Sequence, residues 1–191
     1  QYQQSPDEAF LEGVIWREEI EKMVADGRAG RVPVEPGLPV YTFWDWGMND
    51  MTAVWLVQFI GLEIRLIASY GNSGKNLEHY TNWLKDFAEE HDVRFERKGH
   101  YYPHDFSVRE SDGKTRLQKA KALGFDGVIV PRTPTKTASI NAVRTLFPRL
   151  YIDVERNTEG LQEDRGGWPA IKRYRREYDP DNEVFKKNPL H

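Results

Sequence analysis

Two aspartates stand where strands are expected to end. Asp45 closes a run of aromatic and β-branched residues over 40–45, and Asp105 follows an aromatic pair at positions 101 and 102. A carboxylate at the end of a buried strand must be ionised, hydrogen-bonded or bound to a cation, because leaving it unpaired costs several kcal/mol. Asp50 is a further acid in the first stretch. For Asp45, turn chemistry is the interpretation that this stretch alone favours, since Asp near Gly often ends a strand in a hairpin, and a metal ligand is the alternative.

The composition limits which metal and which reaction are possible. The chain has 191 residues, enough for one domain with a core, a net charge of −3 and no cysteine. Zinc–thiolate sites, disulfides and thiol nucleophiles are therefore excluded, and Mg²⁺ or Mn²⁺ suits a carboxylate site. The stretch 71–75 has the wrong spacing for a P-loop, so the chain has no such ATP site of its own. No apolar run is long enough to cross a membrane, so no membrane partner is expected.

Basic residues gather after the second acid. Residues 114–149 hold eight Lys and Arg against the single acid Asp126, although the whole chain is slightly acidic. Solvated helix faces are one interpretation of this distribution, and a surface that follows a phosphate backbone is the other. The candidates for such phosphate contacts are Arg109, Lys114, Arg116, Arg132, Lys136 and Arg144. For His104, beside the second acid, a structural hydrogen bond is expected.

Three strands and a crossover would position the acids. The strand 40–45, an apolar run over 52–60 and an alternating run over 62–69 predict a meander with a turn at Gly61. Asn76 is placed to cap a helix that ends near residue 90. This helix would return the chain to a fourth strand, ending at His104 and Asp105 and lying parallel to the first. Because parallel neighbours end at the same edge, the two acids would meet there.

The remaining elements alternate between helix and strand. We expect a helix from Lys114 to Gly124, a strand over 127–130, a helix from about Thr137 and a last short strand over 150–154. A helical stretch over 155–178 would be interrupted at 166–169, with Pro169 opening its second part. Before the meander, residues 7–24 predict a helix followed by a linker. The predicted class is therefore α/β, a mixed sheet with an antiparallel three-strand meander followed by parallel strands, flanked by helices.

Five short motifs, in order, carry a resemblance to a known family. They are Leu38-Pro39-Val40 through Trp44-Asp45-Trp46-Gly47, Glu63–Ile67, Tyr102-Pro103-His104-Asp105, Ile140–Arg144 and Tyr174–Tyr178. Together they resemble the C-terminal nuclease domain of the large terminase subunit of tailed bacteriophages, from about Phe10 to His191. The resemblance implies an RNase H-like fold that cuts concatemeric viral DNA, with residues 37–191 as the nuclease domain. Residues 1–36 resemble the exit from the ATPase domain that precedes it in that family.

The resemblance also implies roles for the acids. Asp45 and Asp105 would be catalytic ligands of a divalent metal and Asp50 an additional carboxylate. Two Mg²⁺ or Mn²⁺ ions would support phosphodiester hydrolysis in the complete site. The family usually supplies a third carboxylate from a helix after a Pro-x-His, whereas this chain stops at His191. We therefore expect a site truncated at its C-terminus, with weak metal affinity and reduced activity.

Partners follow from the same resemblance. They would be double-stranded DNA cut with little sequence preference, the terminase ATPase domain, the small terminase subunit and the capsid portal, in the host cytoplasm. The isolated domain is expected to be monomeric. Two alternatives stay open: a coupling module that grips DNA, the portal or the ATPase without chemistry, and another RNase H-like nuclease such as a junction resolvase.

Overall fold

The computed structural model describes residues 13–47, 51–158, 166–179, 182 and 184–189. Its strands are β1 (Ala29–Gly30), β2 (Val40–Asp45), β3 (Met51–Ile60), β4 (Glu63–Ser73), β5 (Phe95–Tyr102), β6 (Gly127–Ile129), β7 (Leu150–Asp153), β8 (Arg176–Asp179) and β9 (Val184–Pro189). The α-helices are α2 (Arg17–Ala25), α3 (Leu77–Glu90), α4 (Arg116–Ala122), α5 (Lys136–Leu146) and α6 (Gly167–Arg173), with 3₁₀ turns η1 (His104–Ser107) and η2 (Phe147–Arg149). Among the described residues, no helix is both long and apolar enough to span a bilayer.

The described strands form one seven-stranded sheet and a separate β8–β9 hairpin. The order in the sheet is β1-β7-β4-β3-β2-β5-β6. Strands β2, β3 and β4 are antiparallel neighbours, and β5 is parallel to β2 while β6 is parallel to β5. The predicted meander followed by parallel strands is confirmed, as is the turn at Gly61, whose positive φ of 58° favours glycine.

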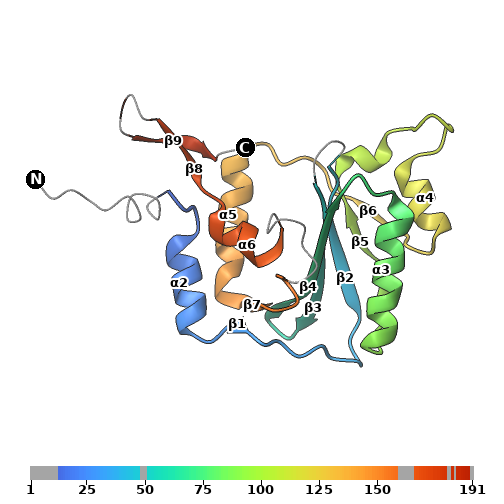
Figure 1. Cartoon of the computed structure of the whole chain (residues 1–191), viewed down its shortest axis with the longest axis horizontal. Helices are drawn as coiled ribbons and strands as arrows, with labels where there is room; N and C mark the ends of the chain where they lie inside the picture. Colours follow the sequence, from blue (N-terminus) through green and yellow to red (C-terminus); the bar gives the residue numbers. More distant parts are fainter. Residues whose placement is uncertain (1–12, 48–50, 159–165, 180–181, 183, 190–191) are drawn as a thin grey trace, which may run out of the picture.

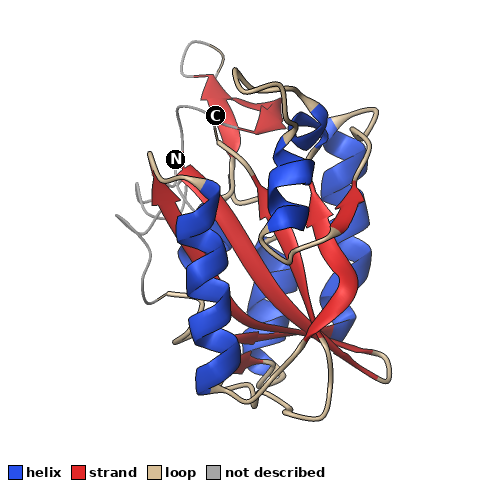
Figure 2. Cartoon of the chain, turned by 90° about the vertical axis from the view of Figure 1, so that its right-hand side faces the viewer, coloured by secondary structure: helices blue, strands red, loops and turns tan. Residues whose placement is uncertain are grey.

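Helices cover both faces of the sheet (Figure 1). α3 and α4 lie on one side, and the buried Tyr80 and Leu84 of α3 belong to a core with Val54 and Leu56 of β3. α2, α5 and α6 lie on the other side, where Met23 of α2 joins a second core cluster. Figure 2 shows the long strands of the sheet running between these helical layers. The sheet is thus buried on both faces, the condition that favours parallel strands.

The predicted crossover helix is confirmed. The side chain of Asn76 accepts a hydrogen bond of 3.0 Å from the backbone N–H of His79, as an N-cap should. α3 buries Leu77, Tyr80, Thr81, Leu84 and Phe87 along one stripe. It therefore returns the chain across one face so that β5 can pair with β2 in parallel.

The N-terminal part of the described chain packs into the same sheet. β1 pairs in parallel with β7, and β7 pairs in parallel with β4 beyond the meander. The helix predicted over 7–24 begins only at Arg17, because Val14 forms an antiparallel bridge with Arg175 instead of a helical turn. Residues 7–12 of that prediction lie outside the described residues, and the domain boundary at residue 36 stays a prediction.

Three further expectations are corrected by the structure. β5 ends at Tyr102, not at Asp105, because Pro103 has no N–H for the ladder and instead precedes η1. β4 extends to Ser73, so the predicted turn over 71–74 is reduced to Gly74. The helix predicted to continue to residue 178 ends at Arg173, and the following residues form β8, which pairs with β9.

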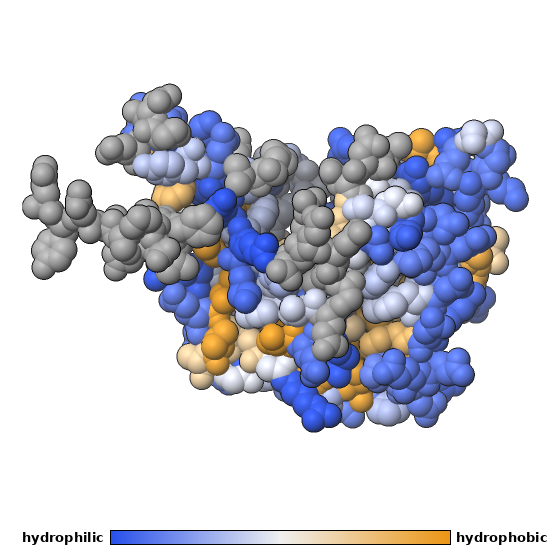
Figure 3. All heavy atoms as spheres, viewed as in Figure 1, coloured by the Kyte–Doolittle hydropathy of each residue, from blue (hydrophilic) through white to orange (hydrophobic). Residues whose placement is uncertain are grey.

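An apolar cleft lies between α5 and the sheet. It has a volume of about 500 Å³ and is lined by Trp55 and Phe59 of β3 and by Val143 and Leu146 of α5, among others. No residue of α5 is fully buried. Figure 3 shows a mostly hydrophilic surface with hydrophobic side chains gathered in the region of α2 and α5.

Candidate active site

Both predicted acids lie where neighbouring parallel strands end. Phe43 of β2 is opposite Tyr101 of β5, and Asp45 is the last residue of β2. Asp105 follows β5 by three residues and lies in η1, where its carbonyl accepts a hydrogen bond of 3.2 Å from the N–H of Val108. Because parallel neighbours end at the same edge of a sheet, the two acids lie at one edge, although Asp105 is carried by a 3₁₀ turn and not by the strand itself.

Buried aromatic rings fix the backbone next to each acid. Trp44 is 7% exposed, and its indole N–H donates to the hydroxyl of Thr42 at 2.8 Å. Phe106, next to Asp105, is fully buried and stacks on Tyr102 with ring centroids 4.3 Å apart. Because the neighbours of the acids are anchored in the core, the carboxylates are held on rigid positions.

The two acids interact electrostatically. Burial and, after it, the negative charge of Asp105 raise the pKa of Asp45 above its ordinary value. Asp45 nevertheless remains accessible to solvent, because it lines an open hollow and does not lie under the core. A carboxylate that is accessible and repelled by a second carboxylate is in an environment that a bound cation would relieve.

We call this cavity the strand-end hollow. Its volume is about 630 Å³, and its lining includes Asp45, His104, Arg132, Thr133 and Ser139. The Nε2 atom of His104 lies 2.6 Å from Oδ1 of Asp105 and 2.7 Å from Nε of Arg132, which donates to it. The hydrogen bond expected for His104 is present, with Nε2 as the acceptor from Arg132; while Nε2 accepts this bond, it has no hydrogen to donate to Asp105.

The described acids fit a hard cation that keeps part of its hydration shell. Asp45 and Asp105 supply two carboxylates, and Asp50 lies outside the described residues. No cluster of three or more His, Asp or Glu able to hold a metal occurs in the part of the chain that is described. Mg²⁺ is commonly held by one or two carboxylates together with water and substrate phosphate, so the pair matches that type of site and not an all-protein cage.

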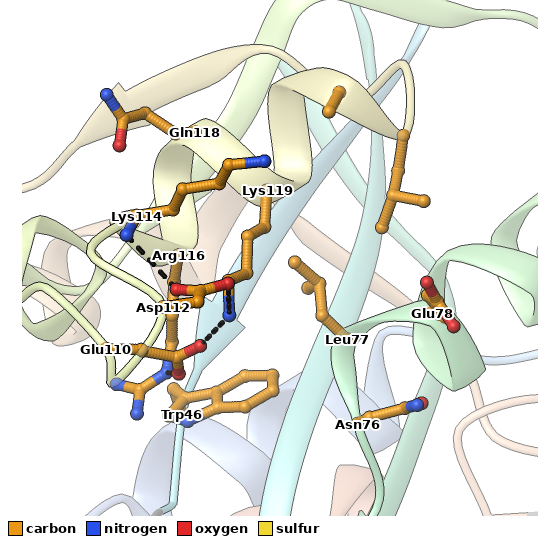
Figure 4. A pocket seen from close by; sticks show the side chains of 12 residues that line it. Trp46, Asn76, Leu77, Glu78, Glu110, Asp112, Lys114, Arg116, Gln118 and Lys119 are labelled. Carbon is orange, nitrogen blue, oxygen red and sulfur yellow. Dashed lines mark hydrogen bonds and ion pairs between the residues drawn. The ribbon is translucent and has the colours of Figure 1, made fainter.

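Two of the six basic candidates line a cavity with Trp46, and a third, Arg109, lies in the chain before α4. Lys114 and Arg116 line a second cavity of about 690 Å³, the Trp46 pocket, shown in Figure 4. Arg116 lies over the Trp46 ring at 5.4 Å and forms an ion pair with Glu110 at 2.7 Å. Arg109 is exposed and donates to the carbonyl of Gly113 at 3.0 Å.

The other three basic candidates lie between β6 and the end of α5. Arg132 lies in the strand-end hollow, and Lys136 is the exposed first residue of α5. Arg144 donates to the carbonyl of Ile15 at 3.0 Å and forms an ion pair with Glu19 of α2. The structure therefore brings Arg132 to the acids, whereas Arg144 joins α2 to α5.

Sequence reasoning missed three polar residues with defined environments. The hydroxyls of Thr133 and Ser139 lie 2.6 Å apart and line the strand-end hollow, but they come from the loop after β6 and from α5, which no spacing rule connects. Asp153 at the end of β7 is 1% exposed and forms an ion pair with Arg156 at 2.8 Å. It lies opposite the middle of β4, below the edge that carries Asp45, so it is not part of the hollow.

The order β4-β3-β2-β5-β6, with Asp45 at the end of β2 and Asp105 in the 3₁₀ turn after β5, is that of an RNase H-like fold. No protein-family model matches the chain, and no curated protein matches its sequence. Among solved structures, the large terminase of a thermophilic bacteriophage aligns with a TM-score of 0.62 and 14% identity over 93% of this chain. The P22 large terminase nuclease domain aligns with a TM-score of 0.52 and 15% identity, covering 83% of this chain and 78% of that one.

These comparisons confirm the predicted resemblance at the level of the fold. The chain spans 41% of the length of the thermophilic phage terminase that it matches. The mixed sheet predicted from the sequence is therefore that of large terminases and of a terminase nuclease domain.

Proposed function

We propose that this chain is a metal-dependent DNA endonuclease domain of a viral genome-packaging motor. The observation that carries the proposal is that Asp45 lines an accessible hollow with His104 and Arg132, while Asp105 contacts His104 and acts electrostatically on Asp45. The likeness in fold to terminases supports the same class of reaction. By the same likeness, its partners would be double-stranded DNA, the terminase ATPase domain, the small subunit and the capsid portal, in the host cytoplasm.

The chemistry divides between the acids and the basic groups. Asp45 and Asp105 would hold Mg²⁺ or Mn²⁺, with Asp50 as an additional ligand, and such ions supply an activated water and charge relief on the phosphate. Asp105 is held next to His104, and Asp45 is fixed by its anchored neighbour Trp44. One carboxylate would thereby be kept at the end of a strand and the other in the turn after its neighbour, on anchored positions such as a site for in-line hydrolysis requires.

Contacts to the DNA backbone would come from exposed cations. Arg109, Lys114 and Lys136 are exposed, and each could contact phosphate without reading bases. Cutting with little sequence preference and with a strong dependence on salt follows from such contacts. Arg116 and Arg144 already have carboxylate partners, so their share of the DNA affinity would be smaller.

The test is nicking of supercoiled plasmid with Mn²⁺, Mg²⁺ or EDTA by the wild type, Asp45→Asn and Asp105→Asn. Asp86→Asn, an exposed acid of α3, is the matched control. We expect metal-dependent nicking that falls by at least about 100-fold in the two site variants and is unchanged in the control. Binding of a fluorescent duplex in Ca²⁺ should persist in both site variants.

A second outcome identifies the coupling module. Equal inactivity of the wild type and the site variants, with duplex binding retained, would leave a DNA-gripping domain without chemistry. That alternative is favoured by one observation: among the described residues, no three or more His, Asp or Glu are grouped so that they could hold a metal. Preference for branched over linear duplex would instead indicate a resolvase.

A further inference from the structure

The strand-end hollow contains anion-binding groups as well as acids. Arg132 and Thr133 follow β6, and Ser139 lies in the second turn of α5. These side chains line the same cavity as Asp45 and His104. A cavity that gathers a guanidinium, two hydroxyls and the Asp45 carboxylate has donors for an anion next to a ligand for a cation.

Arg132 is held in place but is not neutralised. Its Nε donates to Nε2 of His104 at 2.7 Å, which fixes the side chain beside the acid that His104 also contacts. Within the described residues it forms no ion pair with a carboxylate, in contrast to Arg116 and Arg144. Because only Nε is used, the two terminal nitrogens keep their N–H donors for a ligand, in the fork geometry that suits a phosphate.

The two hydroxyls add donors of another kind. Thr133 Oγ1 and Ser139 Oγ are 2.6 Å apart, so one of them donates to the other. Either hydroxyl can rotate to take the donor role, and the pair can therefore offer one O–H to an incoming oxygen. The cavity also has an apolar part, where Phe43 and Tyr101 stack with ring centroids 4.8 Å apart. A phosphodiester is an anion flanked by the apolar C–H groups of two deoxyriboses. Its charge matches the polar part of the cavity, and its sugars match the apolar part.

We infer that Arg132, with Thr133 and Ser139, binds the phosphodiester group that is cut, while the other basic residues bind phosphates further along the strand. The inference rests on the proposed function and assigns different roles to different basic residues. Arg132 would act on the reacting phosphate and so on kcat, whereas Lys114 in the Trp46 pocket would act on DNA affinity and so on KM.

The first experiment needs neither metal nor cleavage. Thymidine 3′,5′-bisphosphate is titrated into the protein in EDTA, and binding is followed by NMR chemical shifts of the backbone amides. We expect shifts in residues around 130–139, at least about fivefold weaker binding in Arg132→Gln, and tighter binding in Asp45→Asn because a repelling charge is removed. Arg149→Gln, whose side chain bonds to the carbonyl of Leu62, is the matched control and should bind as the wild type does.

The second experiment separates the residues kinetically on a DNA substrate with Mn²⁺. We expect Arg132→Gln to lower kcat by about 100-fold with less than about a threefold change in KM, and Arg132→Lys to recover part of the loss. Lys114→Gln should raise KM and leave kcat unchanged. Since Arg132 is exposed, thermal unfolding of its variants should match that of the wild type, which excludes misfolding as the cause.

The two experiments keep the inference separate from the proposed function. Bisphosphate binding that is lost in Arg132→Gln supports the phosphate site even if no DNA is cut, in which case the nuclease proposal alone fails. Binding that is equal in the wild type and Arg132→Gln overturns the inference, whether or not the protein proves to be a nuclease.

Discussion

Asp105 acts electrostatically on Asp45 across the boundary between two parallel strands. Burial first, and the charge of Asp105 second, raise the pKa of Asp45, although its side chain is accessible from the strand-end hollow. Two like charges at one sheet edge oppose folding unless a cation or a proton neutralises them.

This relationship predicts that Asp45→Asn stabilises the metal-free protein at neutral pH. A raised pKa means that the folded state binds the proton more tightly than the unfolded state. The free energy of unfolding therefore falls as the pH rises from about the ordinary value of 3.8 through the folded-state pKa. We expect Tm to increase by roughly 1–3 °C at pH 7 in EDTA, and the gain to vanish at pH 3. Mg²⁺ should raise Tm in the wild type only, and a lower Tm for the variant at pH 7 would contradict the prediction.

His100 predicts a loss of stability in mild acid. It is 2% exposed, its Nδ1 is 2.8 Å from the hydroxyl of Thr42, and burial lowers its pKa from 6.5 to about 4. The unfolded state binds the proton first, so stability is full above pH 6.5 and falls as the pH drops towards 4, by about 3 kcal/mol in all. Urea unfolding between pH 4 and 7 should show a shallower pH slope for His100→Gln than for the wild type. His91→Gln is the control, and equal slopes for all three proteins would refute this account.

Asp153 should be essential to the fold and not to cleavage. Its Oδ2 accepts from the N–H of Val32 at 2.8 Å, its Oδ1 accepts from the N–H of Arg156 at 2.9 Å, and it forms an ion pair with the Arg156 guanidinium. Removing the carboxylate leaves these buried donors unpaired, so Asp153→Ala should cost about 3–5 kcal/mol in urea unfolding. The exposed Glu155→Ala should cost little. A cost below about 1 kcal/mol for Asp153→Ala would show that the contacts are replaceable.

Glu110 and Asp112 should restrain DNA binding. Glu110 forms ion pairs with Arg116 and Lys119, and Asp112 forms one with Lys119 at 3.0 Å (Figure 4). The double variant Glu110→Gln and Asp112→Asn frees both cations for phosphate, so duplex affinity in Ca²⁺ should rise several-fold, with a steeper dependence on salt. Glu78→Gln, which lines the same pocket, is the control. Unchanged affinity and salt slope would mean that DNA does not reach this pocket.

Arg144 should contribute to stability and not to DNA affinity. It joins α5 to α2 through Glu19 and the carbonyl of Ile15. Arg144→Gln should lower the free energy of unfolding by about 1–3 kcal/mol, because charge-assisted bonds at a partly buried position are lost. Duplex affinity should stay at the wild-type value, as it should for Lys121→Gln, an exposed control. A loss of affinity without a loss of stability would return Arg144 to the DNA surface.

The sequence predicts the centre of this fold better than its borders. The meander and the α3 crossover follow from local signals, namely the period-2 strands, Gly61 and the cap at Asn76. β1 has two residues and exists only because β7 lies beside it, so no local pattern could reveal it. β8 was predicted as helix because Ile171, Tyr174 and Tyr178 are spaced helically, yet pairing with β9 outweighs that spacing.

The candidate site, too, could be predicted from the sequence only in part. The proximity of Asp45 and Asp105 follows from the rule that parallel strands end together, and the structure agrees with it. The neighbours of the acids depend on loops whose course the sequence does not determine. Thr133 and Ser139 therefore line the hollow without any sequence signal that foretells it, and the buried pairing of Asp153 becomes visible only when Val32 and Arg156 are in place.

The sheet also has a consequence for how copies of the molecule behave when concentrated. Its edges are β1 and β6, of two and three residues, whereas the long strands β3 and β4 lie inside. Pro131 and Pro134 follow β6 and have no backbone N–H to offer another chain. Such short edges are poor templates for adding a strand from a neighbour. The seven-stranded sheet is thereby protected against edge-to-edge aggregation, which leaves the β8–β9 hairpin as the described place where strand pairing between copies could begin.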